Sequence, residues 1–223
     1  ALAQWITLAG PVMGAAPMPV PPRGAEPLAV AAVNDQLKPA SVADGAGGVI
    51  IAWVDYRSGA SNADIYVKGL DANGAARWPA VALCTASGDQ TAPMIVSDGA
   101  GGAIVTWRDY RSGTNHDIYA QHVLASGAVD PAWPANGQAL CTTANPKELP
   151  AIAADGAGGA IVTWADFRGG DWDVYAQHVL ASGAVDSAWP VDGIALCTAV
   201  NTQEYPAIVA DGSGGAIVTW KDN

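Results

Sequence analysis

The sequence is poor in the features on which several fold and function classes depend. It has a single Phe and three Cys in 223 residues, and its ten Lys and Arg face 21 Asp and Glu, for a formal net charge of −11. Such a charge repels phosphate backbones and anionic membranes, so we expect no nucleic-acid partner. No apolar run is long enough to cross a bilayer, so we expect no membrane insertion. Half of the residues are nevertheless apolar, which predicts a folded core built from Ala, Val, Ile and Trp.

The three cysteines are too regular to suggest a disulfide. Cys84, Cys141 and Cys197 lie 57 and 56 residues apart, in the related strings VALCTA, QALCTT and IALCTA. Equivalent positions in neighbouring repeats would lie too far apart for the short Cα separation that a disulfide needs. We expect buried free thiols that act as small apolar side chains, so cysteine says little about the cellular compartment.

A repeat of about 56 residues dominates the sequence. One motif is written four times, as ASVADGAGGVIIAWVDYRSG (40–59), PMIVSDGAGGAIVTWRDYRSG (93–113), PAIAADGAGGAIVTWADFRGG (150–170) and PAIVADGSGGAIVTWKDN (206–223). Each copy predicts a strand, a glycine turn, and a second strand that is apolar on both faces, as in a strand buried between two layers. The strings DIYAQHVLA (117–125) and DVYAQHVLA (173–181) predict a third strand, and the region around ALCT a fourth. Four antiparallel strands per repeat indicate an all-β fold, a β-propeller of four-stranded blades.

The two ends of the chain complement each other in this pattern. LAQWITLAGPV, near the start, matches the third strand and turn YAQHVLASGAV, while the sequence ends just after a second strand. We therefore expect one domain over residues 1–223, with four blades closed into a ring by a split blade, which hides the sheet edges. The expected units are a half-blade 1–38, blades 39–92, 93–149 and 150–205, and a half-blade 206–223. The proline-rich segment 11–27 departs from the repeat and predicts an extended strap, with a docking segment as the alternative.

The blade motif resembles a known family. The order PAIVADG, IVTW, Asp-x-Arg-x-Gly and Asp-Ile/Val-Tyr is similar to the blade pattern of bacterial TolB-like, WD40-like β-propeller repeat proteins. The resemblance implies the blade rather than a function, since propellers support many activities. The longer unit, the Trp-Pro and Leu-Cys-Thr elements and a blade count nearer four than six depart from that family.

Two sets of residues are candidates for binding, and each also has a structural interpretation. The acid and base pairs Asp55 with Arg57, Asp109 with Arg111, and Asp166 with Arg168 recur in every full repeat. They predict an ion pair that holds a loop, or alternatively a polar surface repeated from blade to blade. Trp78, Trp133 and Trp189 each precede a proline, and could stack on a sugar ring or pin their own loops.

Metal and catalytic patterns are weak. Asp109 with Asp117, and Asp166 with Asp171 and Asp173, form oxygen-rich loops that would suit Ca²⁺, but the loop pattern of a calcium hand is absent. His122 and His178 occupy one repeat position and favour structural hydrogen bonds over a zinc site. No nucleophile elbow, phosphate loop or paired-carboxylate motif stands out.

These observations favour a non-enzymatic module at an extracellular or cell-surface location, with protein or glycan as partner and self-assembly as one form of interaction. The opening residues do not read as a retained signal peptide, and the missing initiator Met is expected of a processed product. A carbohydrate-binding lectin with one weak site per blade is the alternative function. A propeller hydrolase is the second alternative, because blade loops can assemble a site that no linear motif reveals. We expect no cofactor apart from the calcium alternative.

Overall fold

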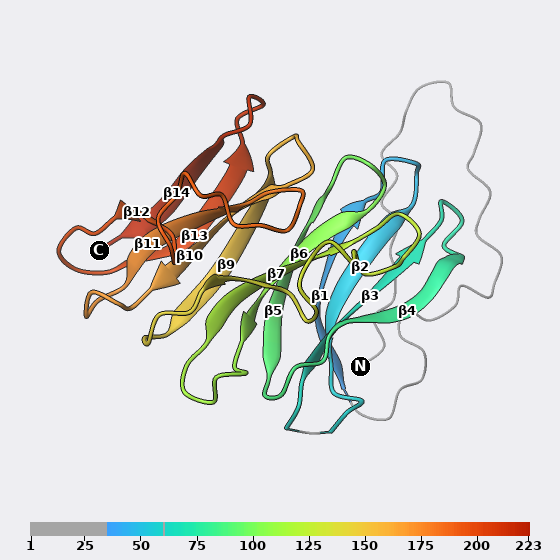
Figure 1. Cartoon of the computed structure of the whole chain (residues 1–223), viewed down its shortest axis with the longest axis horizontal. Coiled ribbons are helices and arrows are strands. Elements are labelled where there is room, and N and C mark those ends of the chain that lie inside the picture. Colours follow the sequence, from blue (N-terminus) through green and yellow to red (C-terminus); the bar gives the residue numbers. More distant parts are fainter. Residues whose placement is uncertain (1–34, 60) are drawn as a thin grey trace.

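A computed structural model describes residues 35–59 and 61–223, which form antiparallel β-sheets arranged in a row (Figure 1). Blade 1 contains β1 (Gln36–Ala43), β2 (Val49–Asp55), β3 (Asp64–Leu70) and β4 (Ala76–Cys84). Blade 2 contains β5 (Gln90–Ser97), β6 (Ala103–Asp109), β7 (Asp117–Val123) and β8 (Gln138–Cys141). Blade 3 contains β9 (Lys147–Ala154), β10 (Ala160–Asp166), β11 (Asp173–Val179) and β12 (Ile194–Cys197). The half-blade contains β13 (Gln203–Ala210) and β14 (Ala216–Asp222).

Each blade is a meander in which strands adjacent in sequence pair with one another. The first hairpin is tied by the Asp of the Asp-Gly-x-Gly-Gly turn, whose carboxylate caps the loop. Asp98 Oδ1, for example, accepts hydrogen bonds from the backbone N–H of Ala100 (2.7 Å) and Gly102 (2.9 Å). The turn therefore satisfies its own backbone donors, which explains why Asp and Gly recur there in every repeat.

The second strands of the three full blades are buried, as their sequence predicts, whereas β14 of the half-blade is largely exposed. Ile50, Ala52 and Val54 of β2 face Ala103, Val105 and Trp107 of β6 in one buried cluster between blades 1 and 2. A second buried cluster joins blades 2 and 3 through equivalent positions of β6 and β10. Because both faces of such a strand are covered, the AIVTW strings have no polar face.

The all-β propeller expectation is confirmed by these four-stranded antiparallel sheets. The predicted pairing of the half-blade 206–223 with residues 1–38 depends on residues 1–34, which lie outside the described part, as does the strap at 11–27. First strands begin earlier than the motif indicates: β13, for instance, starts at Gln203 instead of Pro206. In the described ranges no helix is long and apolar enough to cross a membrane.

An irregularity recurs in the first strand of every blade. The pairing of each first strand with the second shifts register at a residue that precedes a proline. These residues adopt the left-handed conformation although none is glycine: Lys38 (φ 50°), Ala92 (φ 54°), Leu149 (φ 54°) and Tyr205 (φ 55°). The proline offers no N–H to the ladder, so a β-bulge at this point costs little pairing.

The first strands also form the edge at which neighbouring sheets meet most closely. β1 contacts β5, β5 contacts β9, and β9 contacts β13. In a propeller, the strands that approach one another around the axis line the central channel. The bulges therefore lie on the strands nearest that channel.

Neighbouring blades are also joined at their outer loops by a tryptophan that lies on a glycine. The Trp78 ring of blade 1 covers Gly127 (φ +85°) in the turn after β7, and the Trp133 ring of blade 2 covers Gly183 (φ +82°) after β11. A Cβ at either glycine would lie within 2.5 to 2.7 Å of ring atoms. Trp133 Nε1 also donates a hydrogen bond to the carbonyl of Ala181 (3.2 Å). Glycine is required here for both its conformation and its lack of a side chain.

Candidate functional site

The recurring Asp and Arg residues form a clamp at the end of each second strand. In blade 3, Arg168 Nη2 lies 2.6 Å from Asp166 Oδ2, and Trp164 Nε1 donates to the same oxygen at 2.8 Å. The guanidinium also lies 3.8 Å from the ring centroid of Tyr175. Burial raises the pKa of Asp166, but the bonds from Arg168 and Trp164 outweigh it and hold that pKa below its usual 3.8.

The other two clamps repeat this geometry. Asp55 with Arg57, and Asp109 with Arg111, are 2.6 Å ion pairs with fully buried carboxylates. The clamp residues therefore hold the loop after each second strand, which is the structural interpretation of their pattern. A part for them in ligand binding stays a prediction.

The repeated histidines sit between two carboxylates. His122 places Nε2 2.9 Å from Asp98 and Nδ1 2.8 Å from Asp130, while His178 bridges Asp155 and Asp186 in the same way. These imidazoles connect the first hairpin of a blade to its outer loop. Such a repeated polar bridge is a structural element, since no group of three or more His, Cys, Asp or Glu side chains in the described ranges is arranged to hold a metal.

Two of the three loop tryptophans are buried between blades. Trp78 and Trp133 pack on the glycines described above, whereas Trp189 in blade 3 is half-exposed. Of the three, only Trp189 therefore offers part of its ring to solvent in the described region. Sugar stacking by these residues stays a prediction.

Residues shared by every repeat build the blade, so residues that differ at equivalent positions are better candidates for function. The largest differences flank the bulges of the first strands, which read Leu37-Lys38, Thr91-Ala92, Glu148-Leu149 and Glu204-Tyr205. The residue after the clamp tryptophan varies as well, between Val54, Arg108, Ala165 and Lys221. These positions come together near the channel strands, because first and second strands are paired.

A polar cluster forms at these variable positions between blades 2 and 3. Arg108 of β6 makes an ion pair with Glu148 of β9 and donates to Thr91 Oγ1 at 3.3 Å. His116 Nδ1 lies 3.5 Å from the second oxygen of Glu148, and the His116 ring packs at 5.2 Å from Tyr110. Burial and the nearby Arg108 lower the pKa of His116, so the imidazole is neutral at pH 7. We call Arg108, His116 and Glu148 the channel cluster.

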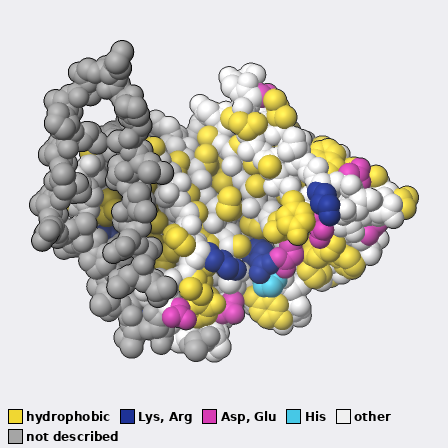
Figure 2. Space-filling view, turned by 180° about the vertical axis from the view of Figure 1, so that it is seen from behind, with side chains coloured by type: hydrophobic (Ala, Val, Ile, Leu, Met, Phe, Trp, Pro, Cys, Tyr) yellow, Lys and Arg dark blue, Asp and Glu magenta, His cyan; other side chains and the backbone are white. Residues whose placement is uncertain are grey.

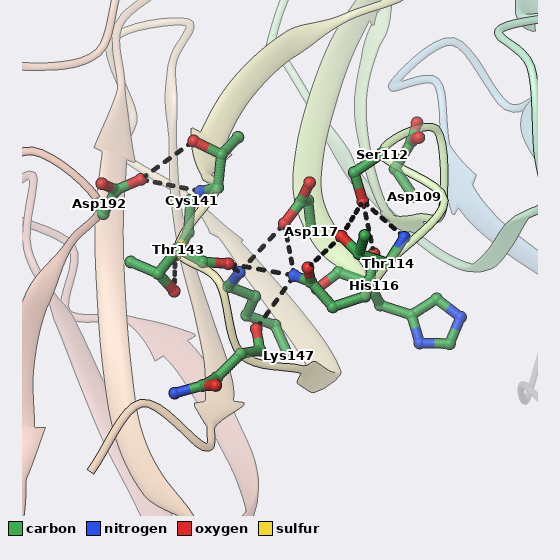
Figure 3. Close-up of polar contacts among 12 residues, drawn as sticks. Asp109, Ser112, Thr114, His116, Asp117, Cys141, Thr143, Lys147 and Asp192 are labelled. Atoms are coloured by element: carbon green, nitrogen blue, oxygen red, sulfur yellow. Dashed lines mark hydrogen bonds and ion pairs between the residues drawn. The ribbon is translucent and has the colours of Figure 1, made fainter.

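The channel cluster is reachable from solvent. The side chains of Arg108, His116 and Glu148 are 18, 27 and 28% exposed. In the close-up of the neighbouring loop the His116 imidazole points away from the buried hydrogen-bond network around Asp117 (Figure 3). The cluster can therefore meet a ligand, which the fully buried clamp carboxylates cannot.

Exposed apolar side chains flank the channel cluster. The first strands carry Leu37, Met94, Leu149 and Tyr205, all of which are exposed, and Tyr205 is 61% exposed. On the face shown in Figure 2, basic, acidic and histidine side chains gather among apolar ones.

A second carboxylate occupies the position equivalent to Glu148 in the half-blade. Glu204 of β13 precedes the bulge residue Tyr205, as Glu148 of β9 precedes Leu149, and the two strands are in contact. Glu204 is partly exposed and lies opposite Lys221 in the pairing of β13 with β14, but its side chain makes no hydrogen bond or ion pair with any residue in the described ranges. Two carboxylates thus lie on adjacent channel strands, one held by a guanidinium and one free of such a partner among the described residues.

The shared motif of the repeats does not reveal this pair of carboxylates, because Glu148 and Glu204 stand where the repeats differ. A signal was present in the comparison of repeats: the residue before the X-Pro step is Leu, Thr, Glu and Glu in successive copies. The cysteines, in contrast, are free as expected, with Cys84 and Cys141 buried and Cys197 half-buried.

Comparisons with known proteins identify the fold. No family model and no curated protein matches the sequence. Solved structures that match include a Penicillium chrysogenum α-L-arabinanase complexed with arabinobiose, at 16% identity and a TM-score of 0.48, over 77% of this chain and 53% of that one. An endo-arabinase from Bacteroides thetaiotaomicron matches at 14% identity and a TM-score of 0.45, over 82% of this chain and 68% of that one. An α-L-arabinofuranosidase from Lactobacillus brevis matches at 11% identity and a TM-score of 0.45, over 83% and 64%.

These matches correct three expectations from the sequence. The TolB-like or WD40-like assignment is wrong, because the matched propellers are arabinanases and arabinofuranosidases. The non-enzymatic module, and with it the absence of enzyme activity, is contradicted by the same matches, which are glycoside hydrolases. The chain spans between half and about two thirds of the length of these proteins. At such identities the likeness establishes the propeller fold alone.

Proposed function

We propose that the protein acts on carbohydrate as a propeller glycoside hydrolase, with Glu148 and Glu204 as its two carboxyl groups. The observation that carries the proposal is their placement: both precede a strained bulge residue, on adjacent channel strands, where the repeats differ from one another.

Glycoside hydrolysis needs one carboxyl group that donates a proton to the leaving oxygen and a second that acts as base or nucleophile. The Arg108 ion pair stabilises the ionised form of Glu148, which suits it to the second part. Glu204, which makes no ion pair among the described residues although Lys221 lies opposite it across the strands, is then the carboxyl group left for proton donation. Tyr205 supplies an exposed aromatic face next to Glu204, of the kind on which a sugar ring stacks.

The substrate that we propose is a polysaccharide rich in pentose, with arabinan as the first to test, since the matched propellers include proteins named for arabinan and arabinose. An extracellular location suits a polymeric substrate of this kind. Cell fractionation of the native source would test it.

The test measures the release of reducing sugar from linear arabinan, arabino-oligosaccharides and a panel of other polysaccharides. Glu148→Gln and Glu204→Gln should each lower kcat at least about 100-fold, the smaller end of what a general acid or base contributes. Asp71→Asn is the control, because Asp71 caps an exposed turn between β3 and β4 and an Asn can keep those bonds. Turnover that survives both Glu variants would refute the assignment of the pair.

Glycan binding without hydrolysis is the second candidate, favoured by the exposed Tyr205 and the half-exposed Trp189. A glycan that binds with unchanged affinity to both Glu→Gln variants, while no substrate is cleaved by the wild type, would favour this function. Loss of that binding in Tyr205→Ala would place the glycan at the channel.

A further inference from the structure

The third strand of each full blade begins with an aspartate that pairs with the clamp aspartate across the strands: Asp64 with Asp55, Asp117 with Asp109, and Asp173 with Asp166. All three third-strand carboxylates are buried. A buried carboxylate needs donors or a cation to offset its lost hydration. The three blades differ in how they meet that need.

Blades 1 and 2 supply partners from the protein. In blade 1, Asp64 accepts hydrogen bonds from Ser58 Oγ (2.5 Å) and Asn62 Nδ2 (3.2 Å). In blade 2, Asp117 accepts from Asn115 Nδ2 (3.0 Å), and Lys147 Nζ lies 3.0 Å from the same carboxylate (Figure 3). Lys147 is fully buried and is the first residue of β9 in the next blade, so blade 2 holds an internal cation at this point.

Blade 3 supplies none of these partners. Gly169 replaces the serine at positions 58 and 112, and Gln203 replaces Lys147. The Gln203 amide donates instead to Asp222 Oδ1 (2.9 Å) and the Asn201 carbonyl (3.2 Å). Asp173 is 4% exposed, and its carboxylate has no hydrogen-bond or ion-pair partner in the described ranges.

The Asp173 carboxylate points toward a second acid. A Cβ built on Gly169 would lie 2.7 Å from Asp173 Oδ2 and 3.6 Å from Asp171 Oδ1, so both oxygens border the space that the missing side chain leaves. Gly169 and Gly170 are exposed, so this space opens to solvent. Burial, followed by the charges of Asp171 and Asp166, raises the pKa of Asp173, and the charge of Arg168 opposes this shift only in part.

We propose that Asp171 and Asp173 bind a hard cation of the calcium type, in the space that Gly169 leaves open where blades 1 and 2 have a serine. No group of three or more His, Cys, Asp or Glu side chains in residues 35–59 and 61–223 is arranged to hold a metal. The two carboxylates therefore act with water and main-chain oxygens, as calcium's flexible coordination allows. Affinity is in the millimolar range of extracellular calcium modules.

The test compares melting temperatures of chelator-treated protein in CaCl₂, MgCl₂ and KCl at matched ionic strength. With a Kd of about 1 mM, CaCl₂ at about 10 mM should raise the melting temperature by about 3 to 6 °C, because a ligand that binds only the folded state stabilises it. An equal rise in all three salts, or none in CaCl₂, would overturn the proposal.

Two variants locate the site. Gln203→Lys copies the internal cation of blade 2 into blade 3, so it should raise the melting temperature without salt and abolish the calcium response. Lys147→Gln removes the internal cation from Asp117, but blade 2 has Asn115 two residues before that aspartate where blade 3 has Asp171, so this variant should add no calcium response. If Lys147→Gln fails to fold, Gln203→Lys and Asp173→Asn still test the site. A calcium-dependent rise in melting temperature that persists in both of these variants would mean that the ion binds elsewhere.

Discussion

Replacing Gly127 by alanine tests the contact that joins blade 1 to blade 2. The residue has a φ of +85°, and a Cβ there would lie 2.5 Å from Cγ and Cδ2 of Trp78. The left-handed conformation costs an alanine about 1 kcal/mol relative to glycine. The clash adds about 1 to 3 kcal/mol, as for other overpacked sites. We expect Gly127→Ala to lower the free energy of unfolding by about 2 to 4 kcal/mol.

Gly99→Ala is the matched control. Gly99 has nearly the same φ, +78°, but no atom lies within 4 Å of the position that a Cβ would take, so only the conformational cost applies. Thermal unfolding followed by circular dichroism should show a loss of about 3 °C for Gly99→Ala and about 6 to 12 °C for Gly127→Ala, at about 3 °C per kcal/mol for a chain of this size. Gly183→Ala, below Trp133, should behave like Gly127→Ala.

A double-mutant cycle separates the ring contact from the backbone. In a Trp78→Ala background the alanine at position 127 meets no ring, so its cost should fall to that of Gly99→Ala. Equal losses for Gly127→Ala and Gly99→Ala in the wild-type background would refute the reasoning. The contact between Trp78 and Gly127 would then make no measurable contribution to the free energy of unfolding.

Three further predictions concern thiols, acid and the ends of the chain. Burial raises the pKa of Cys84 to about 12 and that of Cys141 to about 11. A thiol reagent at pH 7.5 should therefore label only the half-buried Cys197 in the native protein. After denaturation it should label all three cysteines. The pKa of Asp166 in the folded protein lies below its usual 3.8, so the ionised carboxylate contributes its full stabilisation at pH values above 3.8. This stabilisation is lost as the pH falls through the folded-state pKa. A melting temperature that stays level from pH 5 to pH 2 would contradict the stabilising part of the clamp. Deletion of residues 1–10 should lower the melting temperature if the N-terminal segment completes the blade of β13 and β14, and an unchanged value would remove the predicted split-blade closure.

The blade could be predicted from sequence because its information is local. The spacing of Asp44, Asp98, Asp155 and Asp211 gave the period, and alternating glycine turns and β-branched strings gave the strands. The pairing of Asp166 with Arg168 could also be anticipated, because residues two apart in an extended segment point to one side. Each of these inferences needs only a few neighbouring residues.

The channel cluster could not be predicted in this way, because its members converge only in space. Arg108 and Glu148 are 40 positions apart (148 − 108) and belong to different blades. Their contact depends on the bulge that precedes Pro150, which shifts the register of β9 against β10. Proline marks an interruption in the sequence, but the left-handed residue before it follows from the packing of the complete sheet.

The bulges also bear on how such a protein could change its ligand. Lys38, Ala92, Leu149 and Tyr205 share one backbone conformation although their side chains have nothing chemical in common, so the fold accepts a cation, a methyl group, an aliphatic chain or a phenol at this point. A position that tolerates such variety can be altered in one blade without disturbing the other blades. Libraries that randomise these four residues together with Leu37, Thr91, Glu148 and Glu204 would therefore sample new specificities on an unchanged scaffold.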